Sequence, residues 1–487
     1  MGETAGSAKA KLFSRKPSYY VHCIITFFLM FVLKLFIHVP ETSVITQAGA
    51  ELLCVLAGLV WGLIFCGQVF TGILTLIAIG MTGDNSAPAA LAAATSNNSL
   101  IMVVAFGGFV GIFSTSGVSS WIARKLVSAK VGRGHPWILS LLFLLAMYLL
   151  GLFTVGLVTM FAIWELLYQV ADTLDVEQDA PWVRFMIMGV GLCTLLSGGV
   201  FAFQGLNAAY ISMYQGITGA TMNTLKYTLL NLPVTVCAML LYLLAGRFLF
   251  RIDVQKIAKA EVNFEFEPLT FYQKSVLAAL GIMLLALFWT SIMPAGWAIS
   301  RFLNGLTPAG IIFIVDAVLV GLSFTDAEPF NVLMFKGFSW EIYFGLGATL
   351  TMASYITAEG TGIAPFLNQV ISPLFSSFGG FALVALVLLI PALLTNVAAN
   401  LVVCSIFITI VSTMGNSLGL NVAMIVCLLI NVSNVALITP AGCPVAAIVF
   451  GNSHMSAKDA MKYGAVGCLA TFLCSLLIGY PLGSLLF

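Results

Sequence analysis

The sequence predicts an all-α polytopic membrane protein with about 11 transmembrane helices and two re-entrant hairpins in an inverted repeat. Of its 487 residues, 60% are hydrophobic and only 8% are charged, whereas soluble globular proteins carry about 25% charged residues. Runs of about 20 apolar residues recur along the chain, and each is long enough to cross a hydrocarbon core as a helix. The net charge of +1 comes without a basic stripe, so nothing indicates a nucleic-acid partner.

Nine spans can be placed directly in chain order. They cover residues 19–39, 48–66, 68–81, 100–116, 227–249, 273–293, 308–324, 340–356 and 462–486. Two further regions, 136–218 and 371–451, are long and mostly apolar but are interrupted by Gly, Pro, Ser, Thr or Asn. These two regions supply the remaining helices and the hairpins.

The placement of lysine and arginine predicts the orientation, because cytoplasmic loops of membrane proteins carry an excess of both. Basic residues precede the first span and recur in three later loops: Lys9, Lys11, Arg15, Lys16, Arg124, Lys125, Lys130, Arg133, Arg247, Arg251, Lys256, Lys259, Lys458 and Lys462. All of them fall on one side only if each half of the chain contains one hairpin that enters and leaves on the same side. We then expect a cytoplasmic N-terminus, an external C-terminus and a plasma (inner) membrane location.

The two halves of the chain repeat one order of elements. In the first, a Gly-rich span precedes a hairpin turning at "LFTVGLVTMF" and an interrupted span, "LLSGGVFAFQGLNAAYISMYQGITG". In the second, the hairpin turns at "LLTNVAANLVV" and the interrupted span is "NVALITPAGCPVAAIVFGNS". Paired interruptions in opposed halves indicate the midplane binding site of a transporter. Helix N-termini freed there can hold an anion, and freed carbonyl groups can coordinate a cation such as Na⁺.

Polar and acidic residues inside these apolar regions need an explanation. A side-chain amide in hydrocarbon costs several kcal/mol unless it is satisfied, yet Thr395, Asn396 and Asn400 lie in the middle of such a run. Interhelical hydrogen bonds would satisfy them, and so would a ligand. Glu165 and Asp316 are candidates for carrying a coupling proton, although Glu165 alternatively lies near the cytoplasmic end and faces water.

At its C-terminal end the chain resembles the divalent anion/sodium symporter (dicarboxylate transporter) family of the ion-transporter superfamily. The resemblance is carried by "ALITPAGCPVAAIVFGN", then "MKYGAVG" and a closing "LLIGYPLG", and in layout it extends from about residue 100 onward. It implies a homodimer with a scaffold domain and a transport domain that slides as an elevator. It also implies symport of a small organic anion with Na⁺, and no other cofactor.

The resemblance places Ser-Asn-Thr motifs at the two hairpin tips, each facing the loop of a broken helix. The second tip falls on Thr395, Asn396 and Val397, which keep the asparagine and one hydroxyl. The first tip falls on residues 154–156, Thr-Val-Gly, where the asparagine is absent. In the loops, the family has Thr-Pro-Pro-Asn where this chain has Cys-Pro-Val-Ala at residues 443–446.

The implied site residues come from both tips and both loops. The substrate-binding set is Thr154, Val155, Gly156, Phe203, Gln204, Asn207, Thr395, Asn396, Val397, Cys443 and Pro444. The Na⁺-binding set is Thr154, Ser197, Gly198, Gly199, Gly205, Thr395, Asn396, Asn400, Thr439, Ala441 and Gly442. We expect the Asn396 amide NH₂ to face the anion, while Thr395 and nearby carbonyl groups help to hold the cation. Phe201 and Phe203 suggest a solute with an apolar or bulky part beside its acid group.

The expected domain organisation follows the same layout. Residues 1–18 form a cytoplasmic segment, 19–134 the first scaffold helices, 135–226 the inward hairpin and first broken helix, 227–338 further scaffold helices with a cytoplasmic connector, 339–368 a linking helix, 369–455 the outward hairpin and second broken helix, and 456–487 the last transmembrane helix.

Other functions remain as alternatives. The altered first tip leaves open a proton-coupled or exchanging carrier for an anion that is not a dicarboxylate. A channel would need a continuous polar path, whereas the polar residues cluster at two opposed tips. An enzyme is not expected, because the chain has no HExxH and its GxSxG match, "GNSLG" at 415–419, lies between helices and not on a strand-to-helix turn.

Overall fold

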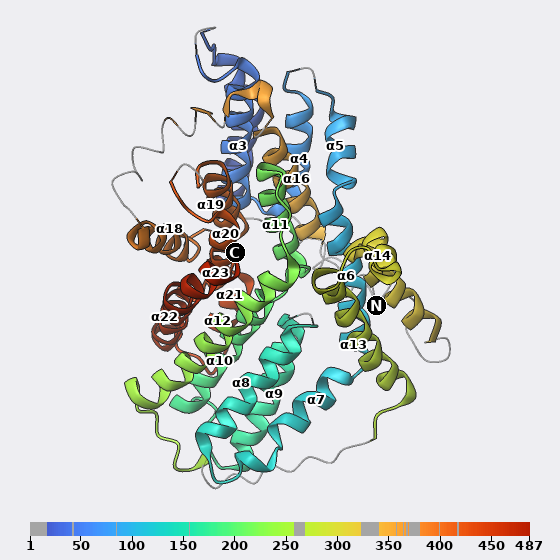
Figure 1. Cartoon of the computed structure of the whole chain (residues 1–487). Coiled ribbons are helices and arrows are strands. Elements are labelled where there is room, and N and C mark those ends of the chain that lie inside the picture. The colour runs from blue at the N-terminus through green and yellow to red at the C-terminus, as the bar shows by residue number, and fades with distance from the viewer. Residues whose placement is uncertain are drawn as a thin grey trace, which may run out of the picture. The chain divides into compact units, whose positions relative to one another are not determined.

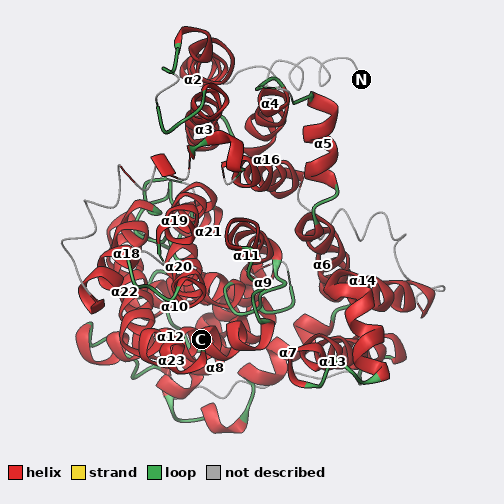
Figure 2. Ribbon diagram, turned by 45° about the horizontal axis from the view of Figure 1, so that its top comes forward, coloured by secondary structure: helices red, strands yellow, loops and turns green. Residues whose placement is uncertain are grey.

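The computed structural model describes residues 17–40, 43–83, 85–154, 156–257, 268–322, 340–356, 358–363, 365–366, 369, 380–398, 400–415 and 418–487. Within these ranges every regular element is a helix (Figure 1, Figure 2). The α-helices are α2 (Pro17–Phe27), α3 (Gln47–Phe65), α4 (Gln68–Gly80), α5 (Ala87–Thr95), α6 (Asn98–Thr115), α7 (Val118–Val127), α8 (Pro136–Gly151), α9 (Gly156–Thr173), α10 (Pro181–Gly198), α11 (Gly205–Thr218), α12 (Thr224–Leu244), α13 (Phe271–Ile292), α14 (Ala298–Leu322), α16 (Trp340–Ile356), α18 (Gly380–Leu394), α19 (Asn400–Met414), α20 (Val422–Asn434), α21 (Pro444–Phe450), α22 (Ala457–Cys474) and α23 (Tyr480–Leu486). π-Helical turns continue α2, α12 and α22 over Phe28–Val32, Ala245–Leu249 and Ser475–Gly479.

In the described part of the chain, seven helices are long and apolar enough to cross a membrane. They are Pro17–Phe36, Gln47–Phe65, Pro181–Gly198, Thr224–Leu249, Phe271–Ile292, Ala298–Leu322 and Ala457–Leu486, with an eighth if α5 and α6, bent by 46° at their junction, form one span. The chain is therefore an integral multi-pass membrane protein. The remaining apolar helices are shorter, so the count of about 11 transmembrane helices stays a prediction.

Two helices differ in extent from the predicted spans. α22 begins at Ala457 and not at residue 462. α14 begins at Ala298, ahead of the predicted start at residue 308, and is kinked at Thr307, whose φ is 59°. Pro308 follows this kink and lacks a backbone N–H, so it removes one hydrogen bond of the helix. The predicted span therefore corresponds to the second half of a longer, bent helix.

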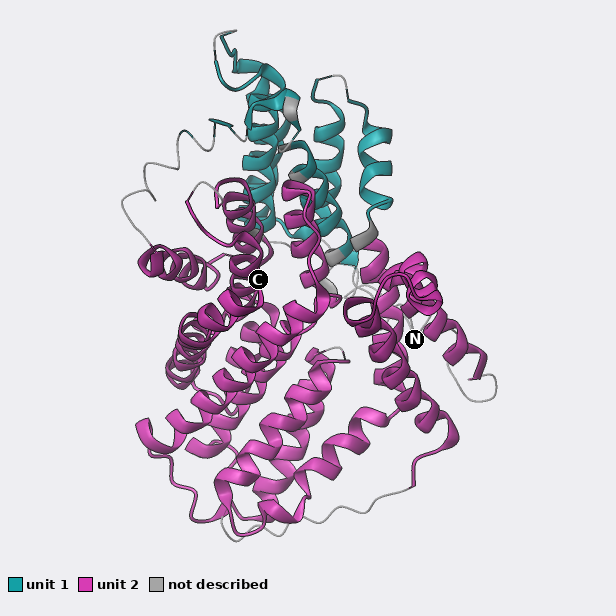
Figure 3. Cartoon of the chain, viewed as in Figure 1, with its two compact units in different colours: residues 1–97, 340–370 teal, residues 98–339, 371–487 magenta. Residues whose placement is uncertain are grey.

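The chain divides into two compact units (Figure 3). Unit 1 comprises residues 1–97 and 340–370. In it, α16 packs against α3, α4 and α5. A Cβ on Gly72 of α4 would lie only 2.4 Å from the carbonyl oxygen of Phe344 in α16, and small residues of this kind let membrane helices approach closely.

Unit 2 comprises residues 98–339 and 371–487 and contains both predicted hairpins and both interrupted helices. α8 ends at Gly151 and α9 begins at Gly156, and α18 ends at Leu394 and α19 begins at Asn400, so a short connection joins the helices of each pair. The chain is interrupted between α10 and α11 at 199–204, and between α20 and α21 at 435–443. Each half thus has a helical hairpin followed by an interrupted helix, in the predicted order. The re-entrance of the hairpins, the scaffold and transport domains and the boundaries given above stay predictions.

α10 lies at the centre of unit 2, packed against α8, α9, α12, α20, α21 and α22. Buried residues make up 78% of its span, the largest share among the candidate spans. Because α10 ends at the first interruption, this packing fixes the position of that end within the unit.

Candidate functional site

The second hairpin tip is attached to the end of α20 by two polar side chains. The buried hydroxyl of Thr395 lies 2.8 Å from the carbonyl oxygen of Ser433 and 2.7 Å from Oδ1 of Asn400. Asn400 donates through Nδ2 to the carbonyl oxygen of Asn434 at 3.1 Å. α20 ends at Asn434, and the last carbonyl groups of a helix have no intrahelical partner. The tip therefore satisfies carbonyl groups that the interruption sets free.

Asn396 connects the same tip to the loop that follows α20. Its side chain is almost buried, with 3% exposed. Its Oδ1 accepts the backbone N–H of Ile438 at 2.8 Å, and its carbonyl oxygen accepts the hydroxyl of Thr439. Its Nδ2 donates to the carbonyl oxygen of Ala392 at 2.7 Å. An amide nitrogen carries two hydrogens, and one of them donates to α18, while the second makes no hydrogen bond among the described residues.

The loop between α20 and α21 holds the predicted cation ligands close together. The Thr439 hydroxyl accepts the N–H of Ala441 at 3.3 Å, and the Thr439 carbonyl accepts the N–H of Gly442 at 3.3 Å. Gly442 is buried, and a Cβ there would lie 2.8 Å from the carbonyl oxygen of Ala436. Only glycine fits this close approach without displacing the backbone.

Cys443, predicted to contact substrate, is the N-cap residue of α21. Its thiol accepts the N–H of Ala446 at 3.4 Å and lies 3.3 Å from the carbonyl oxygen of Ala436, as a helix cap would. Pro444, the first residue of α21, and Val397 at the tip are exposed, the latter by 72%. Of the predicted substrate contacts in this half, these two present their side chains to the surroundings.

The first hairpin tip makes its side-chain hydrogen bonds within the hairpin. The buried hydroxyl of Thr154 donates to the carbonyl oxygen of Leu150 at 2.9 Å and accepts the hydroxyl of Thr159 at 2.6 Å. Val155, predicted to contact substrate, lies outside the described residues. Gly156 is the first residue of α9. Among the described residues of this tip, no side chain makes a hydrogen bond to the facing loop as Asn396 does in the second tip.

Close packing, helped by two glycines, holds the first hairpin against α10. A Cβ on Gly151 would lie 2.2 Å from Oγ of Ser197, and a Cβ on Gly156 would lie 2.7 Å from Cγ2 of Thr194. Ser197 is buried and donates to the carbonyl oxygen of Thr194 at 3.0 Å. The predicted Na⁺ ligand Ser197 is thus brought to the hairpin, although its hydroxyl bonds to its own helix.

Two side-chain amides organise the loop between α10 and α11. Nδ2 of Asn207 donates to the carbonyl oxygens of Gly198 and Phe201, at 2.7 and 2.9 Å. Nε2 of Gln204 donates to the carbonyl oxygen of Leu152 at 2.7 Å. Among the described residues, this is the hydrogen bond that crosses from the loop to the first tip. Asn207 holds two carbonyl oxygens side by side, as a backbone cation site requires.

Gly199 and Gly205, two further glycines of the predicted Na⁺-binding set in the first half, differ in their contacts. The carbonyl oxygen of Gly199 accepts the hydroxyl of Tyr227 at 3.0 Å and Nδ2 of Asn231 at 3.3 Å. A Cβ on Gly199 would lie 2.7 Å from Oδ1 of Asn431. Gly205 is the first residue of α11. Gly199 is therefore close to side chains of both α12 and α20.

The phenylalanines of the first loop form an aromatic cluster. Phe203 stacks on Phe201 with ring centres 4.9 Å apart, and it meets Phe106 edge-on at 5.6 Å. Phe201 lies 5.6 Å from Phe153 of the hairpin tip. Apolar ring contacts thus take the place of polar tip contacts in this half.

Asparagines join the two halves. Nδ2 of Asn434 lies 3.3 Å from Oδ1 of Asn207, and Nδ2 of Asn431 donates to Oδ1 of Asn231 at 2.9 Å. With the bonds described above, the residues Thr395, Asn400, Asn434 and Asn207 form a continuous chain. This chain runs from the second hairpin tip to the first interruption.

Asn231, Asn431 and Asn434 were not among the predicted site residues. All three interrupt apolar stretches, "LLNLPVTV" and "LLINVSNVALITP". The same signal, a polar residue inside an apolar run, singled out Asn396, so it would also have found these three.

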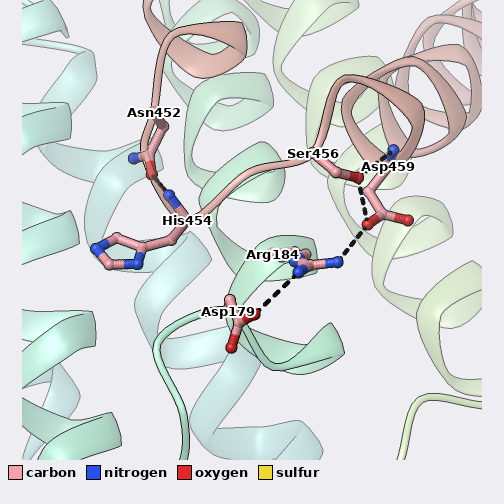
Figure 4. Close-up of polar contacts among 6 residues, drawn as sticks. All are labelled: Asp179, Arg184, Asn452, His454, Ser456 and Asp459. Atoms are coloured by element: carbon pink, nitrogen blue, oxygen red, sulfur yellow. Dashed lines mark hydrogen bonds and ion pairs between the residues drawn. The ribbon is translucent and has the colours of Figure 1, made fainter.

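A charged cluster fixes the end of α10 that lies away from the interruption (Figure 4). Arg184 in the first turn of α10 contacts Asp459 of α22 at 2.8 Å and Asp179 at 3.2 Å. Ser456 caps α22, accepting the N–H of Asp459 at 3.1 Å and donating to its carboxylate at 2.7 Å. α10 is thus tied to α22 at one end and packed against the first hairpin at the other.

The two candidate proton-carrying acids lie in different surroundings. Glu165 is exposed on α9, and its Oε1 accepts Nε2 of Gln169 at 3.1 Å. It lines a groove of about 210 Å³ that Arg124 also lines. Asp316 in α14 is 1% exposed, and neither carboxylate oxygen has a hydrogen-bond partner among the described residues. Glu165 is thus an exposed residue with a polar neighbour, whereas Asp316 is buried without one among the described residues.

The arrangement offers backbone and amide groups for ions but no reactive constellation. Within the described residues no group of three or more His, Cys, Asp or Glu side chains could hold a metal ion. Carbonyl oxygens at the ends of α10 and α20 are oxygen ligands of the kind that a hard cation takes. The geometry therefore suits Na⁺ better than a transition metal.

Comparison with known proteins identifies the family. A comparison with curated proteins finds no match. The family described as Sodium:sulfate symporter transmembrane region matches residues 21–487, nearly the whole chain. This match confirms the resemblance seen in the C-terminal motifs and indicates a non-enzymatic, sodium-coupled anion transporter. The chain belongs to the sodium:sulfate symporter family.

Proposed function

We propose that the protein is a secondary active transporter that moves a small carboxylate-type organic anion together with Na⁺ by an elevator mechanism. The observation that carries this proposal is the repeated pairing of a hairpin tip with a helix interruption in unit 2. The family match supports sodium coupling and anion transport. The carboxylate and the elevator are the parts that we add.

In this proposal the cation sites use carbonyl groups at helix C-termini. The second site takes Thr395, Asn396, Asn400 and the Thr439 loop, whose oxygens lie within one hydrogen-bonded group. The first site takes the carbonyl groups that Asn207 holds together. Helix C-termini carry partial negative charge, so they stabilise a cation without an ionised side chain.

The anion is bound by helix N-termini and the free N–H of Asn396. α9 and α19 begin at the two tips, and α11 begins at the first interruption. Their first backbone N–H groups have no intrahelical partner and carry partial positive charge. A carboxylate can therefore be bound although no lysine or arginine lies at either tip.

The elevator proposal rests on the asparagine chain between the halves. Because the Asn207–Asn434 bond joins the two interrupted helices and the Asn231–Asn431 bond joins α12 to α20, the hairpins, the broken helices and α12 would move as one body. α12, expected among the scaffold helices, is thus assigned to the moving body in this proposal. We propose that this body slides against scaffold helices in a homodimer, with the N-terminus cytoplasmic and the C-terminus external.

A stability measurement tests the function directly. A ligand that binds only the folded state raises stability in proportion to the logarithm of its concentration over Kd. We expect succinate to raise the Tm of the purified protein in NaCl but not in choline chloride. Asn396→Ala should abolish this Tm shift. Leu393→Ala, a substitution at an exposed position of α18 beside the tip, should leave the shift unchanged. A succinate shift of equal size in choline would reject sodium coupling.

Proton coupling is the second candidate, favoured by the buried Asp316. An isolated ionised carboxylate is strongly disfavoured in an apolar interior, so Asp316 is expected to be neutral in this conformation. If protons drive transport, uptake into proteoliposomes should follow an imposed pH gradient, and Asp316→Asn should remove that dependence. If the sodium proposal holds, Asp316→Asn should leave Na⁺-driven uptake responsive to the sodium gradient.

A further inference from the structure

A cavity of about 290 Å³ lies beside the first interruption, within unit 2. Its walls come from α6, α11, α13, α14 and the residues that precede α11 and α12. α11 packs against α6, and α6 packs against α14. The cavity therefore lies between an interrupted helix of the proposed moving body and helices of the proposed scaffold.

The cavity leads from the surface to the loop of the first interruption. Thr307 and Pro308, at the kink of α14, are exposed lining residues. Phe203 and Leu287 are the most buried, at 1% and 2% exposed. Phe203 belongs to the loop in which Gln204 binds the hairpin tip. A solute that enters at the kink therefore comes to this loop.

The lining has no ionisable side chain. Its polar members are Ser212, Gln215, Thr224 and Thr307, and its other members are Met102, Ala202, Phe203, Ala208, Ile211, Met222, Leu287, Pro308 and Ala309. The groove of about 210 Å³ differs, because Arg124 and Glu165 both line it. The cavity therefore suits an uncharged, partly apolar group, and burying a charge in it would be costly.

The size of the cavity separates two kinds of anion. A water molecule needs about 10–15 Å³ of such volume, and small-molecule sites start at about 300 Å³. A compact inorganic anion such as sulfate would leave most of the cavity unfilled and would gain nothing from the apolar walls. An organic anion with an apolar substituent would bury that substituent against Met102, Phe203 and Leu287.

We propose that this cavity binds the uncharged, apolar body of an organic anion whose acid group is held at the hairpin tips. The inference rests on the proposed function and adds a substrate class to it: carboxylates with an apolar substituent, in preference to sulfate. The walls at Leu287 and Ala309 determine the size of the body, and Phe203 forms the wall on the side of the loop that Gln204 joins to the first tip.

The test compares three anions with the purified full-length protein in NaCl: sulfate, succinate and 2-benzylsuccinate. We expect 2-benzylsuccinate to raise the Tm at about tenfold lower concentration than succinate, because its ring is buried in the cavity. Ala309→Phe fills the cavity and should remove this advantage while succinate still stabilises. Ala298→Phe, the same change at an exposed position of α14, should keep it.

Leu287→Ala provides a second variant, which enlarges the cavity. It should favour an anion with a larger ring system, 2-(naphthylmethyl)succinate, over 2-benzylsuccinate. If succinate stabilises the protein in NaCl but 2-benzylsuccinate has no advantage, or if Ala309→Phe weakens both equally, the cavity proposal is wrong and the transport proposal stands. If no carboxylate stabilises the protein in NaCl, both proposals are wrong.

Discussion

The two hairpin tips are held to their interrupted helices by different forces. In the second half, four hydrogen bonds cross from the tip to the end of α20 or its loop, involving Thr395, Asn396 and Asn400. In the first half, one such bond crosses among the described residues, from Gln204 to the carbonyl oxygen of Leu152. Close packing of Gly151 and Gly156 against α10 takes the place of the others.

This difference shows how an inverted repeat can keep its layout while one copy loses its polar motif. The first tip lacks an asparagine, but glycines let the hairpin approach α10, and the Gln204 amide of the facing loop donates a hydrogen bond to the tip. Close packing depends on shape and polar contacts depend on partners, so the two tips should respond differently to substitution.

Asn396→Ala should have the largest effect. It removes the acceptor of the buried Ile438 N–H and a donor to Ala392, and each buried group left unpaired costs about 1–3 kcal/mol. We expect a loss of about 3 kcal/mol and no Na⁺-dependent uptake, measured by thermal unfolding and by flux into proteoliposomes. Asn396→Asp keeps the acceptor, so it should recover part of the stability. If Asn396→Ala and the wild type unfolded at the same temperature, the second tip would not be held by these bonds.

Gly156→Ala should have the next largest effect, through packing alone. The new methyl group would lie 2.7 Å from Cγ2 of Thr194, and overpacking costs about 1–3 kcal/mol. Thr194→Ser removes that methyl group and keeps the hydroxyl that bonds to Val190, so the double variant should regain most of the lost Tm. An equal Tm for the single and double variants would mean that the hairpin does not press on α10.

Much of this arrangement could be predicted from sequence, because the interruptions follow from local chemistry. Gly, Pro and Asn in "LLSGGVFAFQG" and "NVALITPAGCP" cannot continue an apolar helix at no cost, so both loops appeared where expected. The pairing of Asn231 with Asn431 could not be predicted, because these residues are 200 positions apart and any buried amide can satisfy another. The kink of α14 at Thr307 was also missed, because a sequence does not show whether a threonine has a helical or a positive φ.

The asparagine chain predicts a moderate energetic coupling between the halves. In a double-mutant cycle, Asn207→Ala and Asn434→Ala should each destabilise the protein, and the pair should be non-additive by about 1 kcal/mol because the two amides contact each other. A matched pair without contact, Asn207→Ala with Leu393→Ala, should be additive. Additive effects for Asn207 and Asn434 would indicate that the halves are not joined there and would weaken the proposal of one moving body.

Gln204→Leu should have the smallest effect on the Tm. The size of that effect measures how far the first tip depends on polar contacts. The substitution removes the crossing bond to the Leu152 carbonyl oxygen and a longer bond from the Phe201 N–H within the loop, but leaves the glycine packing and the Asn207 bonds unchanged. A hydrogen bond contributes about 1 kcal/mol, and the longer Phe201 bond is the weaker of the two, so the Tm should fall less than for Asn396→Ala or Gly156→Ala. A loss as large as that of Asn396→Ala would mean that both tips depend on polar contacts. Because Asn207 would still hold the Gly198 and Phe201 carbonyl groups, the stabilisation by Na⁺ should persist in this variant.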